Sequence, residues 1–367
     1  MLTVGVEEEY LLVDAVSGQP TPAADRVSRV ARAQPALGED DVQRELLQAQ
    51  LEVATPPCET LDEVGGHLLR LRSELVRAAE SEGCRLLATG AAPLHGDGPA
   101  EVTRTQRYEE IHDHAPRLVD EQLINGMHVH VAVPDRRTGV SLLNRLRPWL
   151  PVLLAMGVNS PVWDGRDTGF ASWRSVHFER WPVSGPPPHF DDEQDYERRA
   201  DALVATGVIR DRAQLYWQAR LSDNYPTIEV RCWDVQLRAD DAVLLAGLLR
   251  ALVARLLADA SAGEVAVPPP PELVRAAAWH AARGGLTAEL VDLPHGGNRD
   301  AREVVSALLE HLRRQLDETG DTEQISALLD RLLREGTGAE RQRAVLERYG
   351  LSALVRWIGA ETAGGAG

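Results

Sequence analysis

The chain has 367 residues, of which 44% are hydrophobic and 26% are charged. This is an ordinary globular composition, long enough for one large domain or two. Its net charge of −17 excludes nucleic acid or an anionic membrane held by a general electrostatic field. The sequence contains no lysine, which excludes the Walker-type phosphate loop, the kinase strand lysine and Schiff-base chemistry. Such a chain can bind ATP only if metal ions and arginine neutralise charge locally.

Cysteine usage and hydropathy place the chain among cytoplasmic proteins. Cys58, Cys84 and Cys232 are widely spaced and form no Cys-x-x-Cys pair, so we expect neither a disulfide framework nor a zinc knuckle. We recognise no signal sequence, and no apolar run reaches the roughly 18 residues that a membrane span needs. We therefore expect a cytoplasmic protein that does not partner a membrane.

The first half of the chain contains acidic strands and amphipathic helices. Leu61, Val64, Leu68, Leu71 and Leu75 follow helical spacing. The patterns predict strands over residues 2–13, 42–53, 84–90 and 126–134, and helices over residues 60–82 and 142–158.

The second half is mostly helical. Residues 163–196 carry little periodicity, and a loop this long is usually functional or disordered; we expect substrate selectivity to lie there. A strand follows over residues 226–237, and helices prevail from Asp240 onward. Because strands and helices do not alternate regularly, the fold class is α+β with an antiparallel sheet. We expect a single domain over residues 1–360 and a disordered tail over residues 361–367.

The first strand carries adjacent carboxylates. Side chains alternate between the two faces of a strand, so Glu7 and Glu9 share one face while Glu8 points the other way with Val6 and Tyr10. Two carboxylates on an inner face repel each other unless a cation or a proton lies between them. A solvated outer face is the alternative interpretation of this strand.

Two further strands carry charged groups with the same alternation. Glu52 shares a face with Gln50, whereas Glu45 lies an odd number of residues away and needs a bulge or turn to join that face. On the last strand Glu229 and Arg231 face one way. They form either a surface ion pair of little energetic value or a metal ligand beside a phosphate clamp.

The strand at residues 126–134 adds two imidazoles, because His128 and His130 share a face. A sheet face of carboxylates, imidazoles and guanidinium groups is not a hydrophobic core. It suits hard divalent cations, which prefer oxygen ligands, while the imidazole leaves Mn²⁺ or Zn²⁺ open.

These motifs together resemble the type 2 glutamate–cysteine ligase family, a group of bacterial carboxylate–amine ligases. The resemblance runs from about residue 3 to about residue 355, with the motifs in the family's order. It is carried by residues 5–10 (GVEEEY), 128–131 (HVHV), 159–163 (NSPVW), 167–174 (DTGFASWR), 181–182 (WP), 185–188 (GPPP), 225–231 (YPTIEVR) and 336–343 (GTGAERQR).

The resemblance implies a glutamine-synthetase-like fold, in which a curved antiparallel β-sheet has helices packed on its outer face. It implies ATP and Mg²⁺ on the inner face, with Mn²⁺ left open. Arg231 and Arg174 are implied as catalytic groups that stabilise the transferring phosphoryl group, and His130, Asn159 and Ser160 as further substrate or ATP contacts. The implied metal ligands are Glu7, Glu9, Glu45, Glu52, His128 and Glu229.

The reaction implied by the resemblance forms an amide from a small carboxylate and an amine through an acyl phosphate, with glutamate and cysteine as one candidate pair. A homodimer is left open. One alternative is a metal-dependent hydrolase of the amidohydrolase kind, which shares the His-x-His motif but expects strand–helix alternation and usually a carboxylated lysine. The other is a non-catalytic family member that binds only a nucleotide or an amino acid.

Overall fold

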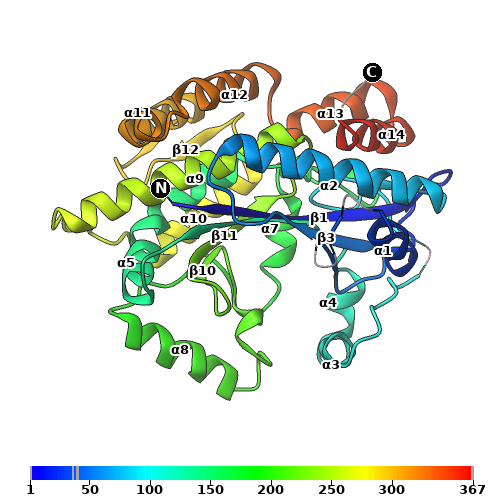
Figure 1. Ribbon diagram of the computed structural model, residues 1–367, viewed down its shortest axis with the longest axis horizontal. Coiled ribbons are helices and arrows are strands. Elements are labelled where there is room, and N and C mark those ends of the chain that lie inside the picture. The colour runs from blue at the N-terminus through cyan, green and yellow to red at the C-terminus, as the bar shows by residue number, and fades with distance from the viewer. Residues whose placement is uncertain (1, 35–36, 39–40, 97, 365–367) are drawn as a thin grey trace.

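The centre of the molecule is an antiparallel β-sheet, seen nearly edge-on in Figure 1. The computed structural model describes residues 2–34, 37–38, 41–96 and 98–364. Within them, seven strands pair in the order β10-β11-β5-β1-β3-β2, with β4 also paired to β1. The strands are β1 (Val4–Asp14), β2 (Val42–Arg44), β3 (Gln50–Ala54), β4 (Cys84–Leu87), β5 (Gly126–Ala132), β10 (Ala219–Leu221) and β11 (Thr227–Asp234).

Helices lie on both sides of this sheet. Figure 1 shows α2, α9 and α11 to α14 on one side and α3, α4 and α8 on the other. The helices are α1 (Ala24–Arg32), α2 (Leu61–Ser81), α3 (Gln106–His114), α4 (Pro116–Asp120), α5 (Arg136–Leu146), α6 (Leu150–Met156), α7 (Trp173–Phe178), α8 (Glu193–Ala205), α9 (Ala239–Ser261), α10 (Pro271–Gly284), α11 (Ala301–Thr319), α12 (Thr322–Glu335), α13 (Gly338–Tyr349) and α14 (Leu351–Thr362). The α+β class expected from the sequence is confirmed.

The face of the sheet that packs on α2 and α9 is apolar. Val4, Val6 and Val129 are buried there with the core residues of both helices. Helix α2 begins where expected, because Thr60 and Glu63 form a capping box that satisfies the first backbone N–H groups. Glu8 also points to this side, as alternation requires, and pairs with Arg72 of α2 through Nη2–Oε1 at 2.5 Å and Nε–Oε2 at 2.9 Å.

Some predicted elements differ from those observed. The helix expected over residues 142–158 is divided into α5, a 3₁₀ turn (Arg147–Trp149) and α6, because Pro148 and Pro151 lack the N–H that a helix interior needs. The segment 163–196 contains α7 and the start of α8, which Ser172 and Asp192 cap at their N-termini. The remaining short elements are β6 (Val162–Trp163), β7 (Arg166–Asp167), β8 (Ser184–Gly185), β9 (Tyr216–Trp217), β12 (Glu289–Val291), β13 (Asn298–Asp300) and a 3₁₀ turn (Arg212–Gln214).

The C-terminal helix α14 runs to Thr362, two residues beyond the expected domain end at residue 360. Thr362 is buried, and its hydroxyl accepts a hydrogen bond from the backbone N–H of Ala88 at 2.8 Å. Residues 365–367 of the expected tail lie outside the described residues. The three cysteines are free thiols. Among the described residues, no helix has the length and apolarity to cross a membrane.

Candidate active site

The strand register gathers the predicted acidic residues on one face of the sheet. Glu9 on β1 stands opposite Glu52 on β3, and Glu7 on β1 stands opposite His128 on β5. Residues directly opposite each other in an antiparallel pair project from the same face. We call this surface the acidic face; it lies away from α2 and α9, and its members come from four neighbouring strands.

Glu45 reaches the acidic face through a turn. Strand β2 pairs with β3 so that Gln43 stands opposite Glu52 and Arg44 opposite Leu51. Glu45 follows directly and shares the orientation of Gln43, because side chains alternate along the strand. It lines the same cavity as Glu52. The turn that the odd spacing required is therefore present between β2 and β3.

A cavity of about 330 Å³ lies over the acidic face. Residues of α3, α7, β10 and the segment before β10 form its other walls, so it is enclosed between the sheet and the helices on that side. Its lining includes Glu7, Glu9, Glu45, Gln50, Glu52, Arg107, Tyr108, His128, Arg174, Phe178, Tyr216, Arg220 and Arg231.

Two groups of side chains have metal-binding geometry. Glu7, His128 and Glu229 form one, and Glu9, Glu52 and His128 form the other, with ligand atoms within 4.8 Å of one another in each. Nδ1 of His128 lies 3.0 Å from Oε2 of Glu7, whereas its buried Nε2 lacks a hydrogen-bond partner. Burial and the nearby Arg231 lower the pKa of His128, so the ring is neutral, the form that binds metals. These donors fit divalent cations bridged by one imidazole.

The part of the acidic face formed by Glu9, Glu45 and Glu52 brings three carboxylates together with little positive charge from the protein. Burial raises the pKa of Glu45 to about 7, and the charge of Glu9 adds to this shift. Burial and the charges of Glu7 and Glu45 likewise raise the pKa of Glu52 well above its ordinary value. A raised pKa means that the ionised carboxylate is unfavourable unless a cation lies nearby. This part of the face is therefore suited to binding cations.

The opposite part is compensated by the protein itself. Burial alone would raise the pKa of Glu7, but hydrogen bonds with His128 and His130 hold it well below the ordinary value. The pKa of Glu229 is also lowered against the effect of burial, because Arg231 and Arg220 lie beside it. Both carboxylates are therefore ionised at neutral pH and available as oxygen ligands.

Three guanidinium groups border the acidic face. Arg231 pairs with Glu229 on its own strand, and Arg220 of β10 grips the same carboxylate at 2.7 and 3.2 Å. Arg174 of α7 is 3% exposed, and its Nη1 donates to the backbone carbonyl of Arg231 at 3.3 Å. A Cβ on Gly126 would lie 2.2 Å from Nη2 of Arg174, so only glycine leaves room for this arginine.

Arg231 and Arg174 were expected from the sequence, whereas Arg220, Arg107 and Tyr108 were not. Arg220 stands opposite Glu229 in the β10–β11 pairing, and this relation becomes visible only when the register is known. Arg107 and Tyr108 reach the cavity from α3. A basic residue before an aromatic one on a short helix carries no sequence signal for such a role.

The structure does not bring Asn159 and Ser160 to the cavity. Both are fully buried. Nδ2 of Asn159 donates to the carbonyls of Ala88 at 2.9 Å and Val235 at 2.8 Å, and the Ser160 hydroxyl donates to Asp234 at 2.7 Å. Their polar groups are paired within the protein and neither residue lines the cavity, so the direct substrate or ATP contacts expected from the sequence stay a prediction.

Ser160 instead supports the position of Arg174. Its hydroxyl also accepts the backbone N–H of Arg174 at 3.1 Å, and Asp234 accepts the Ser172 hydroxyl at 2.8 Å. The start of α7 is thereby fixed against β11. His130, which is absent from the cavity lining, has Nε2 at 3.2 Å from Oε1 of Glu7 and Nδ1 at 3.0 Å from the Thr227 hydroxyl.

Solved structures with the same fold support this view of the molecule. The glutamate–cysteine ligase of Francisella tularensis, determined in complex with AMP, superimposes with a TM-score of 0.72 over 99% of this chain and 89% of that one, at 11% identity. A bifunctional glutathione synthetase from Pasteurella multocida superimposes with a TM-score of 0.69 over 98% of this chain and 52% of that one, at 16% identity. At these identities the likeness shows the fold.

The fold, the acidic face and the chain's relatives define an ATP-dependent carboxylate–amine ligase. The chain belongs to glutamate–cysteine ligase family 2, whose family model matches residues 3–365. A relative from Salinispora tropica is 41% identical over 98% of this chain and 95% of its own length. One from Rhodopirellula baltica is 40% identical over 98% of this chain and 96% of its own. Both are named "Putative glutamate--cysteine ligase 2".

Proposed function

We propose that the protein joins a carboxylate to an amine in two steps at the acidic face. The carboxylate attacks the γ-phosphoryl group of ATP, which gives an acyl phosphate and ADP. The amine then attacks the acyl carbon and releases phosphate, which gives an amide. The observation that carries the proposal is the meeting of five carboxylates, two imidazoles and three guanidinium groups at one enclosed sheet face. We propose that the expected residues 1–360 form a single catalytic domain, which α14 extends to Thr362.

The carboxylates of Glu7, Glu9, Glu45, Glu52 and Glu229, with His128, would hold Mg²⁺ or Mn²⁺. Bound there, the cations would supply the positive charge that lets ATP approach an acidic surface. Arg231, Arg220 and Arg174 border the same space and act on the phosphoryl group as it transfers. Their planar donors match phosphate oxygens, and an enclosed site strengthens each contact.

The substrate pair we propose is glutamate and cysteine, or a closely related amino-acid pair. The family name and the names of the relatives support this choice, and the AMP-bound ligase of the same fold supports an adenine nucleotide at this site. Since ATP and free amino acids would be the substrates, we also propose that the enzyme acts in the cytoplasm.

The direct test is a product assay. Purified protein is incubated with ATP, Mg²⁺, glutamate and cysteine, and then with a panel of carboxylates and amines. We expect ADP, phosphate and a product with the mass of the amide. AMP and pyrophosphate as products would overturn the acyl-phosphate mechanism. Hydrolysis of an amide without ATP would instead support the hydrolase alternative.

The site assignment is tested by removing the negative charge of Glu7 or that of Glu229, the two carboxylates that form a metal-binding group with His128. Glu7→Gln and Glu229→Gln should each lower kcat at least about 100-fold, because loss of a positioned charge-stabilising group typically costs this much. Glu347→Gln, on the exposed surface of α13, makes the same charge change away from the site and should retain activity. Near-full activity in either site variant, with an unchanged melting curve, would disprove the assignment.

A further inference from the structure

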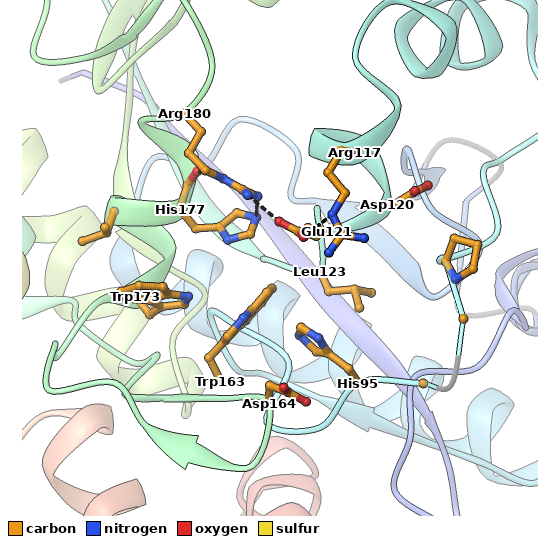
Figure 2. Close-up of a pocket in the computed structure, with 14 residues that line it drawn as sticks. His95, Arg117, Asp120, Glu121, Leu123, Trp163, Asp164, Trp173, His177 and Arg180 are labelled. Atoms are coloured by element: carbon orange, nitrogen blue, oxygen red, sulfur yellow. Dashed lines mark hydrogen bonds and ion pairs between the residues drawn. The ribbon is translucent and has the colours of Figure 1, made fainter.

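A second cavity, of about 650 Å³, lies on the far side of α7 from the catalytic cavity. Helix α7 forms a wall of both: Trp173 and His177 face the second cavity, while Arg174 and Phe178 face the first. The segment after α4 also has residues in the linings of both cavities; Leu123 lines the second one. Figure 2 shows the side chains that converge on this space.

The walls of this cavity are aromatic. Trp163 stands between two imidazole rings, with His95 edge-on at 4.1 Å and His177 tilted at 4.7 Å between ring centroids. Trp173 lies across the cavity from His95 in Figure 2. Burial lowers the pKa of His95 and lowers that of His177 to about 3. Both imidazoles are therefore neutral at physiological pH and present rings without positive charge.

The charged groups around the rings leave one carboxylate free. Glu121 is paired with both Arg117 at 2.6 Å and Arg180 at 2.5 Å. Together with Asp120 and Asp164, the described lining sets three carboxylates against two guanidinium groups. Asp120 lies 3.3 Å from His112. The carboxylate of Asp164 has no hydrogen-bond or ion-pair partner within the described part of the chain.

Asp164 is held at the cavity edge by a tight turn. Asp164 and Gly165 link β6 to β7 with φ angles of 47° and 78°, and an Asp-Gly pair favours such two-residue hairpin turns. Two ring nitrogens at this cavity, Nε1 of Trp173 and Nε2 of His95, are also buried without a hydrogen-bond partner. The cavity thus combines aromatic walls with an exposed carboxylate that has no protein partner among the described residues.

We propose that this cavity binds an organic ammonium ion at a site separate from the catalytic one. The face of an indole ring attracts a cation that is partly removed from water. Trp173 lines the cavity, and Asp164 supplies the opposite charge. The unpaired charge in the lining is negative, which disfavours an anionic ligand. Since α7 walls both cavities, the bound ligand contacts the helix that carries Arg174. The proposal does not depend on the ligase reaction.

The test uses choline as the cationic probe and 3,3-dimethylbutan-1-ol as its uncharged equivalent of the same shape. Each is titrated into the full-length protein by calorimetry without ATP or metal. We expect saturable binding of choline, at least about tenfold tighter than that of the alcohol. In saturation-transfer NMR, saturation of the protein's aromatic protons should be transferred to the choline methyl groups and lower the intensity of their signal.

Asp164→Asn is the decisive variant, because asparagine tolerates the same positive φ and only the charge is lost. It should weaken choline binding at least about fivefold. Glu347→Gln makes the same change in net charge far from the cavity and should bind choline as the wild type does. Absence of saturable binding, equal affinity for the alcohol, or undiminished binding by Asp164→Asn would each overturn the proposal. Because no ATP is present, failure here leaves the proposed ligase activity unaffected.

Discussion

Arg231 lies beside the carboxylates of the acidic face and carries a planar guanidinium group, a shape that lysine lacks. It pairs with Glu229 and borders both metal-binding groups. Arg231→Lys keeps the positive charge but loses the fork of parallel donors that matches phosphate oxygens. We expect kcat/KM to fall at least about tenfold, measured by ADP release under saturating Mg²⁺.

The matched control for this substitution is Arg314→Lys, whose side chain on α11 is 77% exposed. It introduces the same residue into a chain that otherwise has no lysine. If Arg231→Lys retained wild-type kcat/KM, the role of Arg231 would be that of a point charge, and phosphate recognition by its geometry would be refuted.

At this scale, sequence predicted those side chains whose relation is local. Alternation along one strand predicted that Glu7 and Glu9 share a face. The structure adds the register, which brings Glu9 opposite Glu52. Arg220 was missed because its partnership with Glu229 depends on pairing between strands. The surroundings of Asn159 could not be predicted for another reason: a polar residue that satisfies buried carbonyls looks the same in a sequence as one that binds a ligand.

At the scale of elements, α3 and the segment before β9 are joined across the cavity. Arg107 of α3 pairs with Asp211, and Arg210 pairs with Glu110 of α3. Both pairs are partly exposed, so they contribute at most about 1 kcal/mol to stability. Tyr108 of α3 and Tyr216 of β9, which follows this segment, line the cavity, so we expect the pairs to fix its walls.

Asp211→Asn tests this connection. The side-chain oxygen of Asp211 caps the following 3₁₀ turn, and asparagine preserves the cap while removing the charge. We expect KM for a substrate to rise about two- to tenfold, with kcat changed less and the melting temperature nearly constant. The comparison variant is Asp195→Asn, which also keeps a local acceptor while removing a charge that pairs with Arg198 and Arg199 on α8, outside the cavity lining. An unchanged KM would show that these walls need no ion pair.

Sequence predicted elements well where one signal extended over many residues. The apolar spacing of α2 continues for six turns, and its capping box marks its start. The segment 163–196 gave no such signal because α7 has only six residues and the paired strands there have two each. Such short elements are stabilised by caps and by contacts with distant residues, which leave no periodic pattern.

At the scale of the whole molecule, the acidic face should make stability depend on pH and on divalent cations. The native pKa of Glu45 is about 7 against an ordinary value of 4.5. Between these values the native state binds more protons than the unfolded state, so this group's contribution to stability falls as pH rises. Glu7 and Glu229 have lowered pKa values; their contributions are lost only below about pH 4.5 and stay constant from pH 5 to 8.

Histidines with lowered pKa values titrate in the same range with the opposite sign. His177, with a native pKa of about 3, contributes stability that rises with pH up to its ordinary value. The quantity to measure is therefore the difference in melting temperature between Glu45→Gln and the wild type, because the effects of histidine cancel. Without metal, the variant should match the wild type at pH 5 and melt about 2 °C or more higher at pH 8.

Added Mg²⁺ should reverse this order of melting temperatures at pH 8, so that the wild type melts above Glu45→Gln. Divalent cations bind ionised carboxylates, and a ligand that binds only the native state raises its stability. Mg²⁺ should therefore raise the melting temperature of the wild type more at pH 8 than at pH 5, and more than that of Glu45→Gln at pH 8. Glu347→Gln controls for the loss of one charge from a chain of net charge −17. A difference between Glu45→Gln and the wild type that is independent of both pH and Mg²⁺ would contradict the assignment of Glu45 to a cation site.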